Sequence, residues 1–156
     1  MLQSDPIPTS YRDTEVELFM LINAYRQDPQ KLIPFLRELI PQFQGKVYYP
    51  KSGQECFMTQ EGVLVVYEAI EFVKKQKPLP PFQFSKGLYL ASETHCRDIG
   101  KHGLASHKGS DGSILSQRID QFGRWRVLVA ENIAFNDNLA EDILINFLLE
   151  IGRAHV

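Results

Sequence analysis

Residues 106–119 read SHKGSDGSILSQRI and residues 130–135 read AENIAF, and these two stretches are the most informative in the chain. The first opens as a glycine-rich loop around His107 and continues with apolar residues at helical spacing. The second belongs to a segment in which apolar residues alternate. The sequence predicts a loop from Gly103 to Gly112, a short helix capped by Ser113, and one strand over residues 126–135.

Glu131 stands out in the alternating segment because its face is otherwise built from Val127, Val129, Ile133 and Phe135. A carboxylate that faces a core needs a cation, a metal ion or backbone donors as its partner, because burial without one is costly. The alternative is an edge strand from which Glu131 reaches solvent. The sequence leaves both interpretations open.

The histidines differ in their surroundings. His107 lies in the glycine-bounded loop, where a functional role and plain exposure to solvent both fit, and the same holds for His102. His95 lies on the apolar stripe of a predicted helix, which favours a hydrogen-bonded core histidine over a ligand. The sequence contains no zinc-finger spacing and no HExxH, P-loop, GxGxxG or GxSxG pattern.

The other elements follow from apolar spacing and from the prolines and glycines. Residues 1–12 predict an extended arm, and residues 43–57 predict a surface loop. Asn138 is expected to open the last helix, because Glu141 follows three residues later. Further helices are expected from Asp13 to about residue 28, over about 29–42 with an irregular first half, from a Thr59 cap to about Gln76, and from a Ser85 cap to about Lys101.

The composition excludes several classes of protein. With 156 residues, 44% of them apolar, the chain fits a single globular domain. A formal net charge of −2 leaves no basic excess for phosphates, so no nucleic-acid partner is expected, and Lys74, Lys75 and Lys77 are interpreted as a solvated helix end. The sequence has no apolar run long enough for a membrane span and no signal-peptide pattern.

The order of the two stretches resembles the CAP superfamily (cysteine-rich secretory proteins, antigen 5 and pathogenesis-related proteins), also called the SCP domain. In that family a Ser-His pair, a Gly-x-Asp-Gly-Ser turn and an Arg-Ile helix precede a Gly-Glu-Asn-Ile-Ala strand. Ala130 stands here where glycine is usual. The Asn-x-x-Arg pair of Asn23 and Arg26 and the LYLASETHCRDIG helix are also similar, and the resemblance covers residues 13–149.

The resemblance implies a helix-rich α+β fold, an α-β-α sandwich with a small antiparallel sheet, here incomplete at the C-terminus. It also implies a central cleft in which two histidines and two acidic residues bind a divalent metal, often zinc. His107 and Glu131 match two of these metal ligands, and Ser106 and Asn132 are the binding residues expected beside them. No catalytic residue is assigned.

The last residues, 150–156, read EIGRAHV. Glu150 and His155 would supply the two missing ligands, but IGRAHV resembles the translation of a sequencing adapter, with the codon of Glu150 shared between insert and adapter. We therefore expect a partial CAP domain over residues 13–149, whose full-length form continues with the missing histidine and closing strands.

The resemblance favours a non-catalytic module, whose full-length form binds a divalent metal and a lipid, sterol or protein ligand in the cleft. One alternative is a metal-assisted or His/Glu-dependent hydrolase of protease type, with Glu131 or His107 as general base and Ser106 as nucleophile. Another is a metal-free interaction domain in which His107 and Glu131 hydrogen-bond to each other.

Members of the family are often secreted and disulfide-bonded, whereas this chain has only the cysteines Cys56 and Cys96. Two cysteines are too few for a disulfide scaffold, so both are interpreted as reduced, although one bridge between them stays open. The compartment and the oligomeric state stay open as well.

Overall fold

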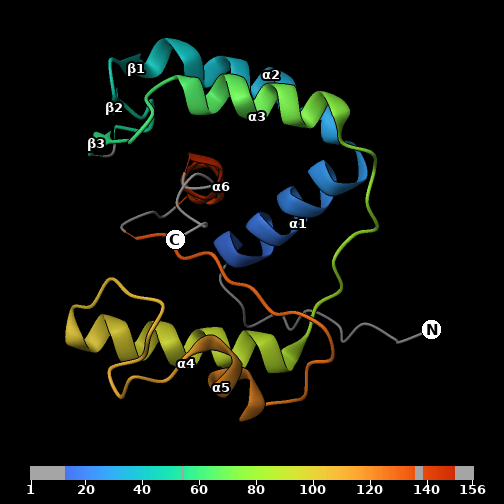
Figure 1. Ribbon diagram of the computed structural model, residues 1–156, viewed down its shortest axis with the longest axis vertical. Helices are drawn as coiled ribbons and strands as arrows, with labels where there is room; N and C mark the ends of the chain where they lie inside the picture. The colour runs from blue at the N-terminus through green and yellow to red at the C-terminus, as the bar shows by residue number, and fades with distance from the viewer. Residues whose placement is uncertain (1–12, 54, 136–138, 150–156) are drawn as a thin grey trace. The chain divides into compact units, whose positions relative to one another are not determined.

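The computed structural model describes residues 13–53, 55–135 and 139–149. Two compact units divide the chain. We call residues 13–82 with residues 139–149 the core unit, and residues 83–135 the motif unit. The predicted α+β class is confirmed, since both units are helical and the core unit carries a small antiparallel sheet (Figure 1). The predicted arm, Asn138 and residues 150–156 lie outside the described residues.

The helices of the core unit lie close to their predicted positions. Helix α1, Asp13–Gln27, stops where Asp28 and Pro29 begin the next element. The second predicted helix is indeed irregular: a 3-10 turn, Pro29–Lys31, leads into α2, Leu32–Leu39, and another, Ile40–Gln42, follows it. Pro34 is tolerated because its missing N–H falls in the first turn of α2. Helix α6 spans Ala140–Leu149.

Helix α3, Leu64–Lys75, begins later than predicted. Thr59 does not cap it: the Thr59 hydroxyl donates to the carbonyl of Lys46 at 2.9 Å and accepts from the Gly62 amide at 3.0 Å. Gly62 has a φ of 64°, and a Cβ there would meet the Gly45 carbonyl oxygen at 2.6 Å. These contacts hold the chain before α3 against the sheet, which delays the start of the helix.

One apolar cluster forms the interior of the core unit. Helix α2 packs against α3 and α1 packs against α6, with α3 also contacting α6 (Figure 1). Leu36 and Val66 are fully buried where α2 meets α3. The buried members of the cluster are Leu32, Leu36, Leu39, Tyr48, Val65, Val66, Ile70, Val73, Ile145 and Leu149.

The sheet lies in the segment that was predicted to be a loop, residues 43–57, and this prediction was wrong. Strands β1, Phe43–Gln44, β2, Val47–Tyr48, and β3, Phe57–Met58, pair antiparallel in that order. Gln44 pairs with Val47, so the hairpin turn has only the residues Gly45 and Lys46. The positive φ of Gly45, 61°, suits such a tight turn. Strands this short carry too few residues for an alternating pattern.

A proline-rich segment, residues 78–82, is bonded along α1. The Asn23 side chain donates to the Phe82 carbonyl at 3.1 Å and accepts from the Phe82 amide at 2.6 Å. Arg26 donates from Nε to the Pro80 carbonyl at 3.1 Å, and its guanidinium carbon lies 3.7 Å from the Phe82 ring centroid. The Leu79 amide donates to the Arg26 carbonyl at 2.7 Å. The Asn-x-x-Arg pair therefore holds a segment that has no regular structure.

The motif unit contains α4, Lys86–His102, and α5, Leu115–Asp120, which pack against each other. The predicted Ser85 cap of α4 is confirmed, because its hydroxyl accepts from the Leu88 amide. Gly103 ends α4 in the left-handed conformation, with a φ of 62°. The predicted Ser113 cap of α5 is off by one residue: Ile114 is the N-cap, and its amide donates to the Gln117 side chain at 3.0 Å.

The predicted strand over residues 126–135 is not a strand in the structure. The segment joins no ladder with any described residue, and Val127 and Leu128 are 90% and 82% exposed. Alternation along a chain encodes two faces, but a strand also needs a neighbour to accept its backbone hydrogen bonds. Among the described residues, no helix is long and apolar enough to cross a membrane.

Candidate functional site

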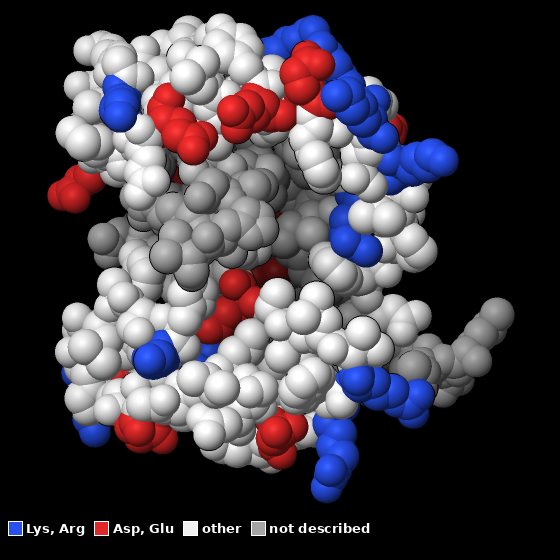
Figure 2. All heavy atoms as spheres, viewed as in Figure 1, with Lys and Arg blue, Asp and Glu red and all other residues white. Residues whose placement is uncertain are grey.

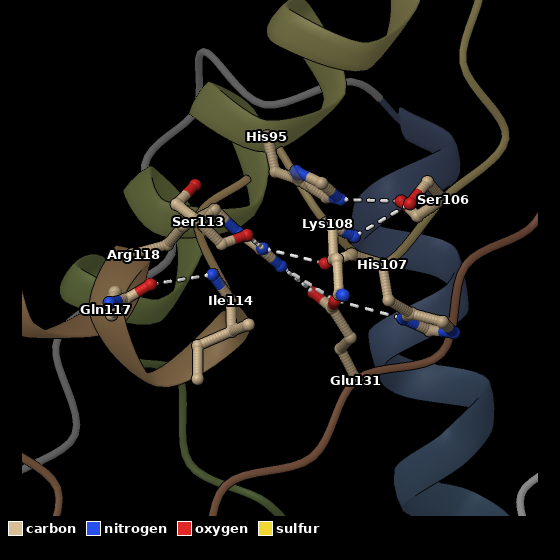
Figure 3. A network of polar contacts seen from close by, with 9 residues as sticks. All are labelled: His95, Ser106, His107, Lys108, Ser113, Ile114, Gln117, Arg118 and Glu131. Atoms are coloured by element: carbon tan, nitrogen blue, oxygen red, sulfur yellow. Dashed lines mark hydrogen bonds and ion pairs between the residues drawn. The ribbon is translucent and has the colours of Figure 1, made fainter. Parts of the chain in front are cut away.

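Glu131 and His107 meet in the motif unit, together with a third residue, Arg118 (Figure 3). His107 Nδ1 lies 3.0 Å from Glu131 Oε1. Arg118, on α5, donates from Nη2 to both Glu131 oxygens at 2.7 Å each. We call these three residues the His–Glu–Arg cluster. The partner that Glu131 required is thus a cation, the buried Arg118.

Arg118 also fixes the surrounding backbone. Its side chain is only 6% exposed, and Nη1 donates to the carbonyls of His107 at 2.9 Å and Ser113 at 3.3 Å. The guanidinium therefore joins α5, the His107 loop and the Glu131 segment (Figure 3). A planar fork with several donors suits such a junction better than a lysine would.

The contacts within the cluster determine which side-chain atoms donate hydrogen bonds and which accept them. A carboxylate that receives two bonds from a guanidinium is an acceptor only, so the proton between His107 and Glu131 belongs to Nδ1 of the imidazole. In the neutral imidazole the other ring nitrogen, Nε2, is then the acceptor. The His107 side chain is 66% exposed and that of Glu131 is 15% exposed. The cluster therefore leaves one imidazole nitrogen of His107 available, while Glu131 and Arg118 hold the ring in position.

Ser106 and Asn132 are placed less closely than predicted. The Ser106 hydroxyl accepts from the Lys108 amide at 2.9 Å, so its bond is to the local turn. The Ser106 carbonyl accepts from His95 Nε2 at 3.0 Å. Asn132 follows Glu131 as an exposed residue. The structure therefore brings His107 and Glu131 together, while the roles of Ser106 and Asn132 stay predictions.

His95 is a core histidine, as its position on an apolar stripe predicted. It is 3% exposed on α4 and ties that helix to the loop through Ser106. Its second nitrogen, Nδ1, and Nε of Arg118 are buried without a protein hydrogen-bond partner among the described residues.

The loop between α4 and α5 is closed by a second set of polar bonds. Asp98 accepts from the Ser110 amide and hydroxyl, and these bonds lower the pKa of its carboxyl. Hydrogen bonds from Ser113 lower the pKa of Asp111 in the same way. Gly109 is buried between them, and a Cβ there would lie 2.5 Å from the Ser113 hydroxyl. His102, in the last turn of α4, donates from Nδ1 to the backbone carbonyl of Asp98 at 2.8 Å, and the same nitrogen lies 3.3 Å from the Asp98 carboxylate.

The described residues fit only part of a zinc site. Structural zinc sites use four protein ligands and catalytic ones usually three. Among the described residues no group of three or more His, Cys, Asp or Glu side chains is arranged to hold a metal ion. Both Glu131 oxygens are already bonded to Arg118. His107 Nε2 remains suited to a metal, with Glu131 as the carboxylate that orients the ring.

A second candidate site lies in the core unit. An open apolar cavity of about 700 Å³ runs between α1, α3 and α6. Its walls include Ile22, Tyr25, Val65, Phe72, Leu144 and Leu148, and its polar lining comes from Arg26, Gln76, Glu61 and Glu68. Burial raises the pKa of the Tyr25 phenol, and the charge of Glu141 adds to the effect, so the phenol stays protonated at neutral pH.

Sequence reasoning missed Arg118 and this cavity. The sequence contained a signal for Arg118. The Glu131 carboxylate on an apolar face needs a partner such as a cation, and an arginine lies in the next predicted helix upstream. The signal for the cavity was weaker. Phe72 lies off the buried stripe of α3 and is 67% exposed, yet single exposed aromatic residues are common.

Comparison with known proteins gives one match. The family model of the cysteine-rich secretory protein family, CAP, matches residues 19–155. No curated protein and no solved structure matches the chain. The matched range includes the His–Glu–Arg cluster and all the residues that line the cavity, and it extends beyond residue 149. The adapter origin of residues 150–156 and the domain boundary at residue 149 stay predictions.

Proposed function

Because the chain belongs to the cysteine-rich secretory protein (CAP) family, we propose that it is a non-catalytic CAP module that binds a lipid in the cavity between α1, α3 and α6. The observation that carries the proposal is the cavity itself. Its volume of about 700 Å³ falls within the range of about 300–1,000 Å³ that is typical of small-ligand sites.

The walls of the cavity favour an apolar ligand. Aliphatic and aromatic side chains form most of its surface, and only a few polar side chains line it. Burying apolar ligand surface against such walls is favourable at about 25 cal/mol per Å². Phe72, 67% exposed beside the cavity, would gain shelter from water when a ligand fills it.

Displacement of the neutral dye 1-aminoanthracene by dodecanol, laurate or cholesterol tests this proposal. We expect the dye to bind and at least one of these compounds to displace it. Ala69 lines the cavity, so Ala69→Phe should fill it and weaken binding about tenfold or more. Ala24→Phe, at an exposed position on α1 outside the cavity, is the matched control and should bind normally. Absence of binding, or equal losses in both variants, would contradict a ligand site here.

A divalent metal at His107 is the second candidate function. It is supported by the outward Nε2, which is left as an acceptor by the bond between Nδ1 and Glu131. The further ligands would have to come from residues outside the described part of the chain. Bound zinc would supply a positive charge at the imidazole, while Glu131 and Arg118 would hold the ring in place.

Zinc titration by calorimetry tests the metal. We expect His107→Ala to abolish the binding heat and His102→Ala, which removes another exposed histidine, to leave it unchanged. Zinc binding that is lost equally in both variants would refute a site at His107. No heat in the natural chain would favour the metal-free interaction domain, in which the bond between His107 and Glu131 is purely structural.

The hydrolase alternative has less support. A Ser–His pair needs the serine hydroxyl within hydrogen-bond reach of the imidazole, and among the described residues the Ser106 hydroxyl is seen to bond only to the Lys108 amide, from which it accepts. Peptide hydrolysis that is lost in Ser106→Ala would support Ser106 as its nucleophile, and hydrolysis that persists in that variant would exclude this role. Absence of hydrolysis by the chain itself would argue against the hydrolase alternative.

A further inference from the structure

We propose that the chain binds the surface of anionic membranes through an exposed loop that follows α5. This loop comprises residues 124–128, Arg-Trp-Arg-Val-Leu, and we call it the tryptophan tip. It belongs to the motif unit, so the proposal does not depend on the apolar cavity of the core unit. Three features of the tip support it: exposed apolar side chains, a bend in the backbone, and two arginines without a counter-charge.

The tip carries the most exposed large apolar side chains of the described residues. Val127 is 90% exposed and Leu128 is 82% exposed, whereas Met58, the next in order, is 70% exposed. Trp125 lies beside them in the sequence and is also exposed. Transfer of such side chains out of water is favourable, so the three side chains favour contact with an apolar phase.

The backbone bends at Arg126 and Val127, which makes the segment a tip and not a strand. A strand that adds to a sheet stays extended, and its neighbouring side chains point to opposite faces. Here the adjacent side chains of Val127 and Leu128 are both largely in water. This geometry favours insertion of the tip into a membrane interface over pairing with an extended peptide or with a second copy of the chain.

The backbone of the tip sets how deep it can enter a membrane. It makes no hydrogen bond with the described part of the chain, and Figure 1 shows it as a loop after α5. Backbone groups without partners are costly in hydrocarbon, because no water is present there to bond them. The tip therefore fits the head-group region, which is also where tryptophan is enriched in membrane proteins.

The two arginines give the tip a positive charge. Residues 121–130 contain Arg124 and Arg126 and no acidic residue, although the whole chain has a formal net charge of −2. Both arginines are exposed, and neither forms an ion pair with a described carboxylate. Glu131, the next acidic residue along the chain, already binds Arg118. Guanidinium groups bind phosphate and carboxylate oxygens, so the tip is complementary to anionic lipid head groups.

Fluorescence of the natural chain tests the proposal without a variant, because Trp125 is its only tryptophan. The probes are vesicles of phosphatidylcholine alone and vesicles with equal parts of phosphatidylcholine and phosphatidylserine. We expect the anionic vesicles to shift the emission of Trp125 to shorter wavelength, and binding measured by cosedimentation to weaken as sodium chloride rises. Binding without a change in emission, or equal binding to both kinds of vesicle, would overturn the proposal.

Two double variants separate the apolar contribution from the charged one. Val127→Ser with Leu128→Ser should weaken binding to the anionic vesicles about tenfold or more. Arg124→Gln with Arg126→Gln should weaken it by about fivefold for each arginine. Both variants should fold, since the four side chains are exposed. Unchanged binding in both double variants would overturn the role of the tip.

The matched control for charge uses the other basic region of the chain. Lys74 and Lys75 lie in the last turn of α3, and Figure 2 shows basic side chains gathered over that end of the core unit. Lys74→Gln with Lys75→Gln removes the same charge as the arginine variant and should leave the affinity largely unchanged. An equal loss would overturn the tip, because it would show attraction by net charge alone.

The matched control for apolar surface is Met58→Ser with Leu64→Ser. These side chains of the core unit are 70% and 61% exposed, and their removal should leave vesicle binding in place. A loss as large as that of the apolar tip variant would show that exposed apolar residues in general cause the binding. It would therefore overturn a specific role of the tip.

The tip and the cavity can fail separately. Ala69→Phe, which fills the cavity, should bind anionic vesicles as the natural chain does. Absence of binding to either kind of vesicle would overturn the membrane surface and leave the lipid site standing. Sedimentation velocity adds one further outcome. A dimer of the natural chain that dissociates in Val127→Ser with Leu128→Ser, without vesicle binding, would overturn the proposal in favour of a second copy as the partner of the tip.

Discussion

The core unit and the motif unit are each stabilised internally by a different kind of interaction. In the core unit, α2, α3 and α6 share an apolar cluster in which Leu36 and Val66 are fully buried. In the motif unit, two of the five residues buried on α4 and α5 are polar, His95 and Arg118, beside Ala91, Ile99 and Ile119. Much of the order in that unit comes from hydrogen bonds to backbone carbonyls and carboxylates.

This difference explains why the two units carry different kinds of information in the sequence. A polar network tolerates few replacements, because each donor must meet its acceptor. Its residue types are therefore recognisable as a motif in the sequence. An apolar cluster accepts many combinations of similar volume and leaves only a spacing pattern. The family resemblance accordingly rests mainly on residues of the motif unit, with only the Asn23 and Arg26 pair in the core unit, and the sequence did not predict the cavity in the core unit.

Removing Arg118 should have the largest effect on the free energy of unfolding. It tests directly whether polar interactions stabilise the motif unit. Arg118→Met leaves Glu131, 15% exposed, without its cation, and we expect a loss of about 3–5 kcal/mol in the free energy of unfolding. Urea unfolding followed by amide exchange in α4 measures it. Glu131→Gln in the same chain should restore part of the loss. A loss below about 1 kcal/mol in the single variant would show that packing, not the network, holds the motif unit.

The corresponding test of the apolar half is Leu36→Ala. Leu36 is fully buried, so we expect a loss of about 2–5 kcal/mol from transfer and cavity formation. Leu36→Met keeps the volume and should cost less than about 1.5 kcal/mol. The measurement is urea unfolding followed by amide exchange in α3. Equal losses in both variants would mean that side-chain shape matters here as strictly as hydrogen bonding does in the motif unit.

High pH should weaken the core unit selectively. Burial, with a smaller contribution from the charge of Asp142, raises the pKa of Tyr48 to about 12 from 10. The folded state therefore favours the protonated phenol, and this preference is fully present below pH 10 and is lost as pH rises through 12. The effect is at most about 2–3 kcal/mol.

Urea unfolding between pH 9 and 12 checks the Tyr48 prediction. Tyr48→Phe should flatten the decline in stability, at the expense of the weak bond to Gln42 at 3.2 Å. Tyr49→Phe, at a neighbouring exposed position, should leave the decline in place. The same decline in both variants would assign it to another group.

The smallest expected effect concerns the Ser85 cap of α4. Its hydroxyl accepts from the Leu88 amide at 3.4 Å, so Ser85→Ala should cost about 0.5–1 kcal/mol. Thermal unfolding is the measurement, and Ser92→Ala, exposed within the same helix, should cost less. If both variants behave alike, the cap adds nothing to the polar bonds of the motif unit.

The sequence was a good guide wherever local chemistry decides the structure. Asp28 and Pro29 separate the first helices, Ser85 caps α4, and His95 is buried as its stripe predicted. The pairing of His107 with Glu131 across 24 residues came from the family motif, since neither residue alone specifies a partner.

The errors arise where distant segments decide. Thr59 has the chemistry of an N-cap, but the Lys46 carbonyl engages its hydroxyl. The strands at residues 43–58 are two residues each, below the length at which a period can be seen. Residues 126–135 have the period without a described neighbour to pair with. Propensity and pattern contain no information about which partner is within reach.

The hydrogen bonds that hold residues 78–82 against α1 should affect how proteases cleave this segment. Only Leu79 and Phe82 carry an N–H between residues 78 and 82, and both donate to α1, at the Arg26 carbonyl and the Asn23 side chain. A stretch without helix or strand is usually an early site of cleavage. Here the hydrogen bonds to α1 must break before the backbone can enter a protease active site. The peptide bond after Phe82 should therefore resist chymotrypsin. Asn23→Ala should turn that bond into an early cut, visible as two bands in limited digestion.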